Sequence, residues 1–336
     1  MNEVNNRGYK RFLKPALISF FSVFFLFYLI AIFWSIEPDV FDVRTEQAYR
    51  VKENEQTLVV GYTTINTLIR IADELLTKSG GFISNDVVPP GVFMDNMPGW
   101  ELGVLTQVRD MARVLRKDMS RSQSQSVEQD DLKEVQPKFN IDRNKWMFPS
   151  AENEYREGIE GLENYLQKLA DSTDPNTQFY ARADNLREWL RDVEKQLGSL
   201  SQRLAASVGQ ERINVDLAGE AAATQSTRTL TEISVKTPWW EIDDVFYEAR
   251  GACWALIHLL RAIDIDFAET LDKKNAATSL RQIIRELEAT QQTVWSPMIL
   301  NGSGFGLFAN HSLVMASYIS RANAGVIDLR ELLGQG

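Results

Sequence analysis

The most pronounced feature of the hydrophobic pattern is an uncharged run over residues 15–36, PALISFFSVFFLFYLIAIFWSI. At about 1.5 Å per residue, a helix of this length crosses the ~30 Å hydrocarbon core of a membrane. A buried helix of a soluble protein would carry a polar stripe, and a cleaved signal peptide would have a shorter apolar region followed by small residues. This run ends in Phe33, Trp34, Ser35 and Ile36. We therefore predict an uncleaved signal anchor, with Trp34 at the far membrane interface.

The charges on either side of this run predict its orientation. Basic residues precede it and acidic residues follow it: Arg7, Lys10, Arg11 and Lys14 before, and Glu37, Asp39 and Asp42 after. Because the positive flank of a span stays in the cytoplasm, residues 1–14 form a predicted cytoplasmic tail. The chain beyond residue 36 is expected on the opposite side, which for the inner membrane of a bacterium is the periplasm.

Two later stretches carry heptad patterns, in which apolar residues recur at alternating steps of four and three. The first is preceded by Asp174 and Pro175, which suit an N-cap and a first helical position. Its apolar positions are Phe179, Ala183, Leu186, Leu190, Val193, Leu197, Leu200 and Leu204. The second follows Thr237 and Pro238. Its apolar positions are Ile242, Phe246, Ala249, Cys253, Leu256, Leu260, Ile263 and Phe267.

The matched length of these two seams suggests that their helices pack against each other within one chain. An intermolecular coiled coil is the alternative. Apolar residues also flank the seams, as at Trp189, Trp254 and Ile257, and make the stripe wider than a two-stranded coil requires. This width favours an intramolecular bundle.

Helical periodicity extends over most of the remaining chain. Further helices are predicted at residues 57–79, 101–119, 151–170, 275–294 and 310–333. Ser150 is the expected N-cap of the third of these. Alternation between residues 213 and 235 is weak, so no hairpin is expected there. The predicted fold class is all-α, an N-terminal transmembrane helix followed by an elongated multi-helix bundle.

A polar segment over residues 121–150, which begins with the low-complexity run RSQSQS, is predicted to be an exposed linker. It divides the part after the anchor into a first helical subdomain, residues 37–120, and a second, residues 151–336. The second contains both heptad-patterned helices.

Composition narrows the range of functions. The 336 residues carry a formal net charge of -10, and residues 37–336 alone carry 32 basic and 45 acidic residues, which argues against a nucleic-acid partner. One cysteine and two histidines leave little for a metal site, and no sequence pattern indicates a cofactor. Neither a cofactor nor a metal is therefore expected.

The loop over residues 80–101 is the strongest candidate for a ligand site. It combines carboxylate, amide and aromatic side chains, namely Asp86, Asp95, Asn96, Trp100 and Glu101. Two carboxylates beside a stacking surface are what glycan binding or glycoside hydrolysis needs. The alternative is a packed helix connection whose polar side chains cap turns. The run GSGFG at residues 302–306 lacks the strand and spacing of a phosphate loop, so a tight turn is expected there.

A basic stripe is the second candidate surface. It lies opposite the apolar face of its predicted helix and consists of Arg109, Arg113, Arg116, Lys117 and Arg121. Such a stripe suits anionic lipid or an acidic partner. The alternative is an ordinary solvated helix face.

Several long segments together carry a resemblance, among them GYTTINTLIR, SNDVVPPGVFMDNMPGWE and NGSGFGLFANHSLVMASYISRANAG. The chain resembles, over nearly its whole length, a family of uncharacterised proteobacterial proteins, domain of unknown function 2333. This resemblance implies a bacterial source and a single N-terminal membrane anchor. It implies no activity and no catalytic residues.

These observations favour an inner-membrane protein held through residues 15–36, with a non-enzymatic role as scaffold, adaptor or assembly factor of the cell envelope and a protein partner there. Two alternatives remain open. One is a glycan-binding protein or glycan-cleaving enzyme that uses the 80–101 loop, and the other is a homo-oligomer that assembles through the heptad seams.

Overall fold

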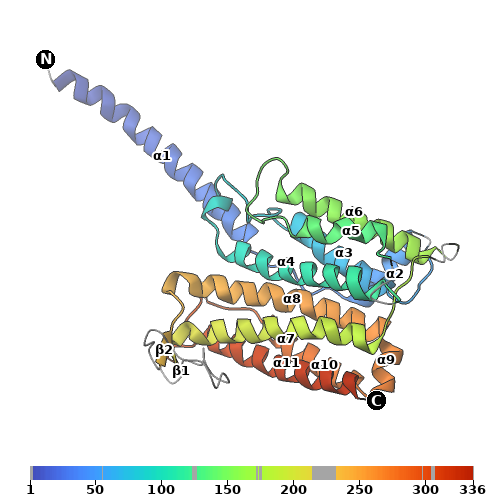
Figure 1. Cartoon of the computed structure of the whole chain (residues 1–336). Coiled ribbons are helices and arrows are strands. Elements are labelled where there is room, and N and C mark those ends of the chain that lie inside the picture. The colour runs from blue at the N-terminus through green and yellow to red at the C-terminus, as the bar shows by residue number, and fades with distance from the viewer. Residues whose placement is uncertain are drawn as a thin grey trace, which may run out of the picture.

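The structure, a computed structural model, describes residues 3–54, 56–122, 127–171, 173, 176–213, 232–296, 298–303 and 307–335. Its fold is all-α. Helix α1 (Glu3–Trp34) projects from one end of a bundle (Figure 1). Within it, residues 14–34 form a segment long and apolar enough to cross a membrane, and none of that segment is buried.

The bundle has two layers (Figure 1). The first contains α3 (Tyr62–Thr77), α4 (Asn96–Val114), α5 (Asp130–Phe139) and α6 (Ala151–Ala170), with the short α2 (Val43–Glu53) at one end. The second contains α7 (Ala183–Ala205), α8 (Ile242–Asp266), α10 (Ala277–Ala289) and α11 (His311–Gly334), with α9 (Ala268–Lys273) after α8. The buried apolar side chains of both layers form one continuous core.

Glycines allow α4 and α8 to approach each other closely where the two layers meet. A Cβ added at Gly103 would overlap the carbonyl oxygen of Glu248, and one added at Gly99 would lie 2.9 Å from that of Asp244. On α8, a Cβ added at Gly251 would likewise overlap the carbonyl oxygen of Trp100. The two helices run parallel, and the absence of side chains at these positions brings backbone against backbone.

The two helices with heptad patterns do not form one matched pair, which corrects the prediction. Helix α8 packs mainly along α4, and α7 packs mainly along α11. Helix α7 begins at Ala183, and Asp174 and Pro175 lie outside the described residues. Before α7, the backbone N–H of Tyr180 donates to the carbonyl oxygen of Met119 at 2.7 Å, so this segment binds the end of the α4 region instead of extending α7.

The prediction of an exposed linker over residues 121–150 was wrong for part of this segment, because the segment contains helix α5. Leu132, Val135 and Phe139 of this helix are buried in the core. Gly161 on α6 leaves room for the Val135 side chain, so α5 and α6 pack side by side. The segment that looked polar therefore contributes to the bundle.

A short antiparallel ribbon is the third correction. Strand β1 (Gln210–Ile213) pairs with β2 (Glu232–Val235), with Gln210 opposite Val235. The residues between the two strands lie outside the described part of the chain. The ribbon connects α7 to α8, and the N–H of Thr237 donates to the carbonyl oxygen of Ala206 at 3.1 Å.

Two predicted helix starts are confirmed by their caps. The Ser150 hydroxyl accepts from the N–H of Asn153 at 3.4 Å at the start of α6. The Asn310 side chain accepts from the N–H of Leu313 at 2.8 Å at the start of α11. Each satisfies a backbone donor that the first turn leaves without an intrahelical partner.

The bundle has two distinct ends. Helix α1 leaves at the end where the β1–β2 ribbon lies, whereas α9 and the C-terminus lie at the opposite end (Figure 1). The N-termini of α4, α6, α8 and α11 lie at the end nearest α1. Contacts of Asn85 with Glu152 at 2.8 Å, and of Arg250 with the Thr290 carbonyl at 3.0 Å, connect the loops there. We call it the α1 end.

Candidate functional site

Glu101, one of the predicted ligand residues, is a buried carboxylate that holds its own loop. Its side chain lies 2.6 Å from the Lys78 ammonium, and both side chains are almost fully buried. The backbone N–H groups of Ile83 and Ser84 each donate to it at 2.8 Å. These bonds compensate the charge for its removal from water. Glu101 therefore fixes the course of the chain between α3 and α4.

The other predicted residues of this loop do not gather around one open site. Trp100 is buried, with its ring centroid 5.2 Å from that of Trp254. Asp95 is exposed and caps α4, accepting from the N–H of Asn96 at 2.9 Å. Asp86 is half-buried, and burial raises the pKa of its carboxyl, with a further contribution from nearby negative charge. The structure thus separates the aromatic ring from the exposed carboxylate.

Four members of the predicted basic stripe bind groups within the chain. Arg109 donates to the carbonyl oxygens of residues 139 and 141 at 2.7 and 2.8 Å, and Arg113 pairs with Asp192. Arg116 and Arg121 both approach Glu128, at 3.4 and 3.7 Å. Lys117 is exposed. The arginines therefore join α4 and the π-helical turn Leu115–Met119 to α5, α7 and residue 128.

The segment that follows α1 is joined to α8 by several polar contacts. Residues 37–42 run along α8, and we call them the strap. Arg250 of α8 contacts both carboxylate oxygens of Glu37, with Nε at 2.9 Å from each. Its Nη1 donates to the carbonyl oxygens of Thr290 and Gln292 at 3.0 and 2.9 Å. One buried guanidinium thus joins the strap to the end of α10.

The same face of α8 binds the strap at every second residue. Trp254 Nε1 donates to the carbonyl oxygen of Asp39 at 3.2 Å. His258 and Arg261 contact the N–H and the carbonyl oxygen of Phe41 at 3.0 and 3.2 Å. Four helical residues rise about 6 Å, and two extended residues rise about 6.6 Å. The spacing along α8 therefore matches that of an extended chain.

Trp34, at the end of α1, packs on the domain. A Cβ added at Gly80 would lie 2.7 Å from the Trp34 ring, and Gly80 has a φ of 85°, a conformation that favours glycine. The strap and this contact together leave no free linker between α1 and the bundle. The position predicted for Trp34, at the membrane interface, is compatible with this contact. The contact places the bundle directly beside α1.

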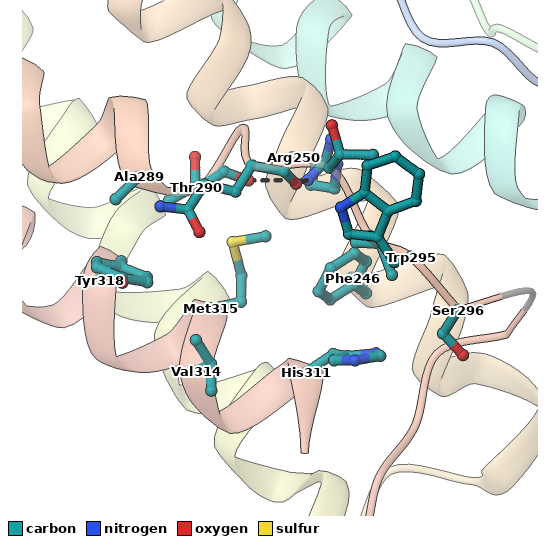
Figure 2. A pocket seen from close by; sticks show the side chains of 13 residues that line it. Phe246, Arg250, Ala289, Thr290, Trp295, Ser296, His311, Val314, Met315 and Tyr318 are labelled. Atoms are coloured by element: carbon teal, nitrogen blue, oxygen red, sulfur yellow. Dashed lines mark hydrogen bonds between the residues drawn. The ribbon is translucent and has the colours of Figure 1, made fainter. Parts of the chain in front are cut away.

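A cavity of about 440 Å³ opens beside Arg250, between α8, α11 and the segment after α10. Figure 2 shows Phe246 and Trp295 on one side of it and His311, Val314 and Met315 of α11 on the other. Its walls are mostly aromatic and aliphatic, with Arg250 at one edge. The His311 ring accepts a hydrogen bond at Nδ1 from the N–H of Leu300 at 3.1 Å, which holds Leu300 beside the start of α11.

Sequence reasoning missed the strap, although α8 carried a signal. Arg250 and His258 interrupt a helix whose other faces are apolar, and both are buried. Buried polar side chains need partners, so their presence predicts an unassigned polar segment against α8. The sequence does not say which segment supplies it.

Of the predicted loop at residues 302–306, residues 304–306 lie outside the described part of the chain.

In the described residues, no three His, Cys, Asp or Glu side chains lie close enough together to hold a metal ion. Cys253 is fully buried in α8, and burial raises the pKa of its thiol to about 12. Its thiol therefore stays protonated at neutral pH.

Comparisons with known proteins agree with the resemblance seen in the sequence. No curated protein and no solved structure matches the chain significantly. One family model matches residues 9–336, which is nearly the whole chain. The chain therefore belongs to the family described as uncharacterized proteins conserved in bacteria, DUF2333.

Proposed function

We propose that this chain is a single-pass protein of the bacterial inner membrane whose helical domain lies in the periplasm and acts as a scaffold or adaptor for envelope proteins. The strap carries this proposal. Because residues 37–41 are bound along α8, the domain has a fixed position relative to α1. An enzyme for freely diffusing substrates gains little from such a fixed position. A scaffold gains a constant height and direction at which it presents its faces to neighbours.

The charges on the two sides of α1 support the proposed orientation. The basic residues Arg7, Lys10, Arg11 and Lys14 precede the apolar segment, and the first charged residue after it is Glu37. This asymmetry favours a cytoplasmic N-terminus and an exported domain.

The glycan-directed alternative receives less support from the geometry of residues 80–101. Trp100 and Glu101 are buried, so neither offers a stacking surface or an acid to a sugar. Self-assembly through the heptad seams also receives less support, since the seam residues Leu190, Leu197, Leu256 and Leu260 are buried within one chain.

The orientation is tested by fusion of alkaline phosphatase, which is active only after export, to the C-terminus of the full chain. We expect an active enzyme in intact cells. A matched fusion that lacks residues 1–36 should be inactive. Activity of the first fusion that is no higher than that of the second would contradict the proposed topology.

The scaffold role is tested by cross-linking in intact cells, followed by capture of the full-length protein. We expect one envelope protein in near-equal amount. Arg250→Met, which releases the strap, should lower its recovery severalfold. The matched control is Arg281→Met, which removes the ion pair between an exposed arginine and Asp264 and should leave recovery unchanged. Repeated capture of the chain alone would contradict the scaffold role.

A further inference from the structure

Exposed aromatic side chains gather at the α1 end of the domain. Outside α1, the exposed tryptophan and phenylalanine residues of the described chain come from four loops, and we call them the aromatic rim: Phe93, Trp146, Phe148, Trp239, Trp240, Trp295 and Phe308. Each loop adjoins a helix terminus at the α1 end, namely the start of α4, α6, α8 or α11, or the end of α10. The exposed apolar residues toward the opposite end, such as Tyr49, Leu58 and Val60, include no tryptophan or phenylalanine in the described residues.

The degree of exposure in this rim is unusual for a surface that faces only water. Phe93 is 77% exposed, Phe148 89%, Trp239 82% and Trp295 94%. Large apolar patches on a folded protein mark surfaces that contact a partner or a membrane. Tryptophan in particular is enriched where hydrocarbon meets water, since its ring is apolar and its N–H is polar.

Part of the rim lies beside the apolar segment of α1, where the two line a groove. This groove lies between α1 and the loop that precedes α4, and has a volume of about 890 Å³. Phe24, Phe27 and Tyr28 line one wall, and Pro90 and Phe93 line the other. The wall on α1 runs from Phe20 to Ser35, which is fifteen residues, or about 22 Å. The groove therefore extends along about two thirds of the apolar segment, which is more than the depth of one leaflet.

We propose that the α1 end of the domain is itself a membrane-binding surface, in which the aromatic rim lies in the lipid interface and acyl chains fill the groove between α1 and the loop before α4. The wall that α1 contributes identifies the occupant, because a helix that crosses the membrane is surrounded there by lipid. The strap and the contact of Trp34 with Gly80 hold the rim toward the same leaflet. This inference rests on the proposed membrane insertion of α1.

Apolar insertion, not charge, drives this contact. Acidic groups close to the rim outnumber basic ones: Asp95, Asp142, Glu241, Asp243 and Asp244, against Arg143, Lys145 and Lys236. Burial and the neighbouring carboxylates raise the pKa of Asp244 to about 6. An anionic membrane would repel the net negative charge of this surface, so a zwitterionic bilayer is the favoured surface.

The test uses the full chain in nanodiscs of zwitterionic lipid, one chain per disc, with single cysteine substitutions labelled by an environment-sensitive fluorophore. Phe93→Cys and Trp239→Cys place the label in the rim. Tyr49→Cys, an exposed site on α2, is the matched control at the opposite end. Cys253 is buried and stays unlabelled in the folded chain.

We expect lipids brominated in the upper acyl chain to quench the two rim labels at least about twofold more than the Tyr49→Cys label, because interfacial side chains lie within reach of these positions. Equal quenching at all three sites would overturn the proposal. So would rim labels that are shielded from water but not quenched, since another protein surface would then cover them. Stronger quenching in anionic discs than in zwitterionic discs would also overturn it.

The experiment separates this inference from the proposed function. A chain that washes out of the discs in high salt lacks an inserted anchor, and both proposals then fail. A chain that stays inserted while its rim labels remain in water refutes the rim alone.

Discussion

The backbone N–H of Phe41 donates a hydrogen bond to Nε2 of His258 at 3.0 Å, and the two rings stack with their centroids 3.8 Å apart. The other ring nitrogen, Nδ1, lies 2.7 Å from the carbonyl oxygen of Trp254. A carbonyl only accepts, so Nδ1 carries the proton and Nε2 accepts from the strap. The neutral ring therefore satisfies both partners, and a second proton would oppose the N–H of Phe41.

The first prediction concerns pH. Burial, mainly, and the charges of Arg261 and Arg70 lower the pKa of His258 to about 3, against the opposing effect of the hydrogen bond to Trp254. Between pH 6.5 and about 3, the unfolded chain binds a proton at this site that the folded chain does not, so stability falls as pH falls. The expected loss at this site is about 1.4 kcal/mol per pH unit below pH 6.5.

This loss is measured by urea unfolding of the full chain in micelles at several pH values. The comparison is with His258→Phe, which cannot titrate. Carboxyl groups with raised pKa, such as Asp266, contribute equally to both proteins. Their contribution cancels in the difference between the two stability curves. Parallel curves for the two proteins from pH 7 to pH 5 would contradict the assignment.

The second prediction concerns the strap. Arg250→Met leaves the Glu37 carboxylate and the carbonyls of Thr290 and Gln292 without their shared donor. We expect a loss of about 3–5 kcal/mol in the free energy of unfolding, as for other broken buried pairs. Limited proteolysis should then cut within residues 37–42.

The control for the strap is Arg281→Met, whose side chain is 63% exposed in its pair with Asp264. Its loss should stay below about 1 kcal/mol, with no new cleavage. A strap that resists protease in Arg250→Met would show that the guanidinium does not hold it.

The third prediction concerns the α4–α8 contact. In Gly103→Ala, the new methyl group would meet the carbonyl oxygen of Glu248, and separation of the helices should cost about 1–3 kcal/mol. Gly198→Ala on α7 is the matched control, because the nearest atom, of Asn323, lies 3.6 Å away. It should gain up to about 1 kcal/mol in helix propensity. Thermal unfolding measures both, and a neutral Gly103→Ala would contradict the close approach.

The fourth prediction separates a structural role from a catalytic role within residues 80–101. Glu101→Gln turns an amide group toward Lys78 and two backbone donors, and should destabilise the fold by about 3–5 kcal/mol. Asp95→Asn keeps a good N-cap and should change stability by less than about 0.5 kcal/mol. Chemical unfolding measures both variants. A Glu101→Gln variant that keeps full stability but abolishes binding of a glycan would favour the enzymatic alternative.

Strong periodicity predicted most of the helices well. The bounds of α6 match residues 151–170 and its Ser150 cap, since an amphipathic helix between clear start and stop signals needs no tertiary information. Helix α5 escaped notice because only Leu132, Val135 and Phe139 face the core. Three apolar positions in a short charged segment do not form a distinctive pattern.

The sequence did not predict which helices pack against each other. A heptad seam predicts that a helix is buried along one face, but not by which neighbour, so α7 and α8 were wrongly paired with each other. The glycines of α4 select α8 through backbone proximity, a relation visible only in three dimensions. Glu101 likewise has the composition of a catalytic residue, and only its burial beside Lys78 indicates its structural role.

The strap also sets an order of events during synthesis. Glu37 is made 213 residues before Arg250, and Phe41 precedes His258 by 217. The strap, the earliest segment of the domain to be made, can therefore form these contacts only after α8 has been made. Until α8 has emerged, the nascent domain has no fixed position relative to α1. A product truncated before residue 250 would never acquire one.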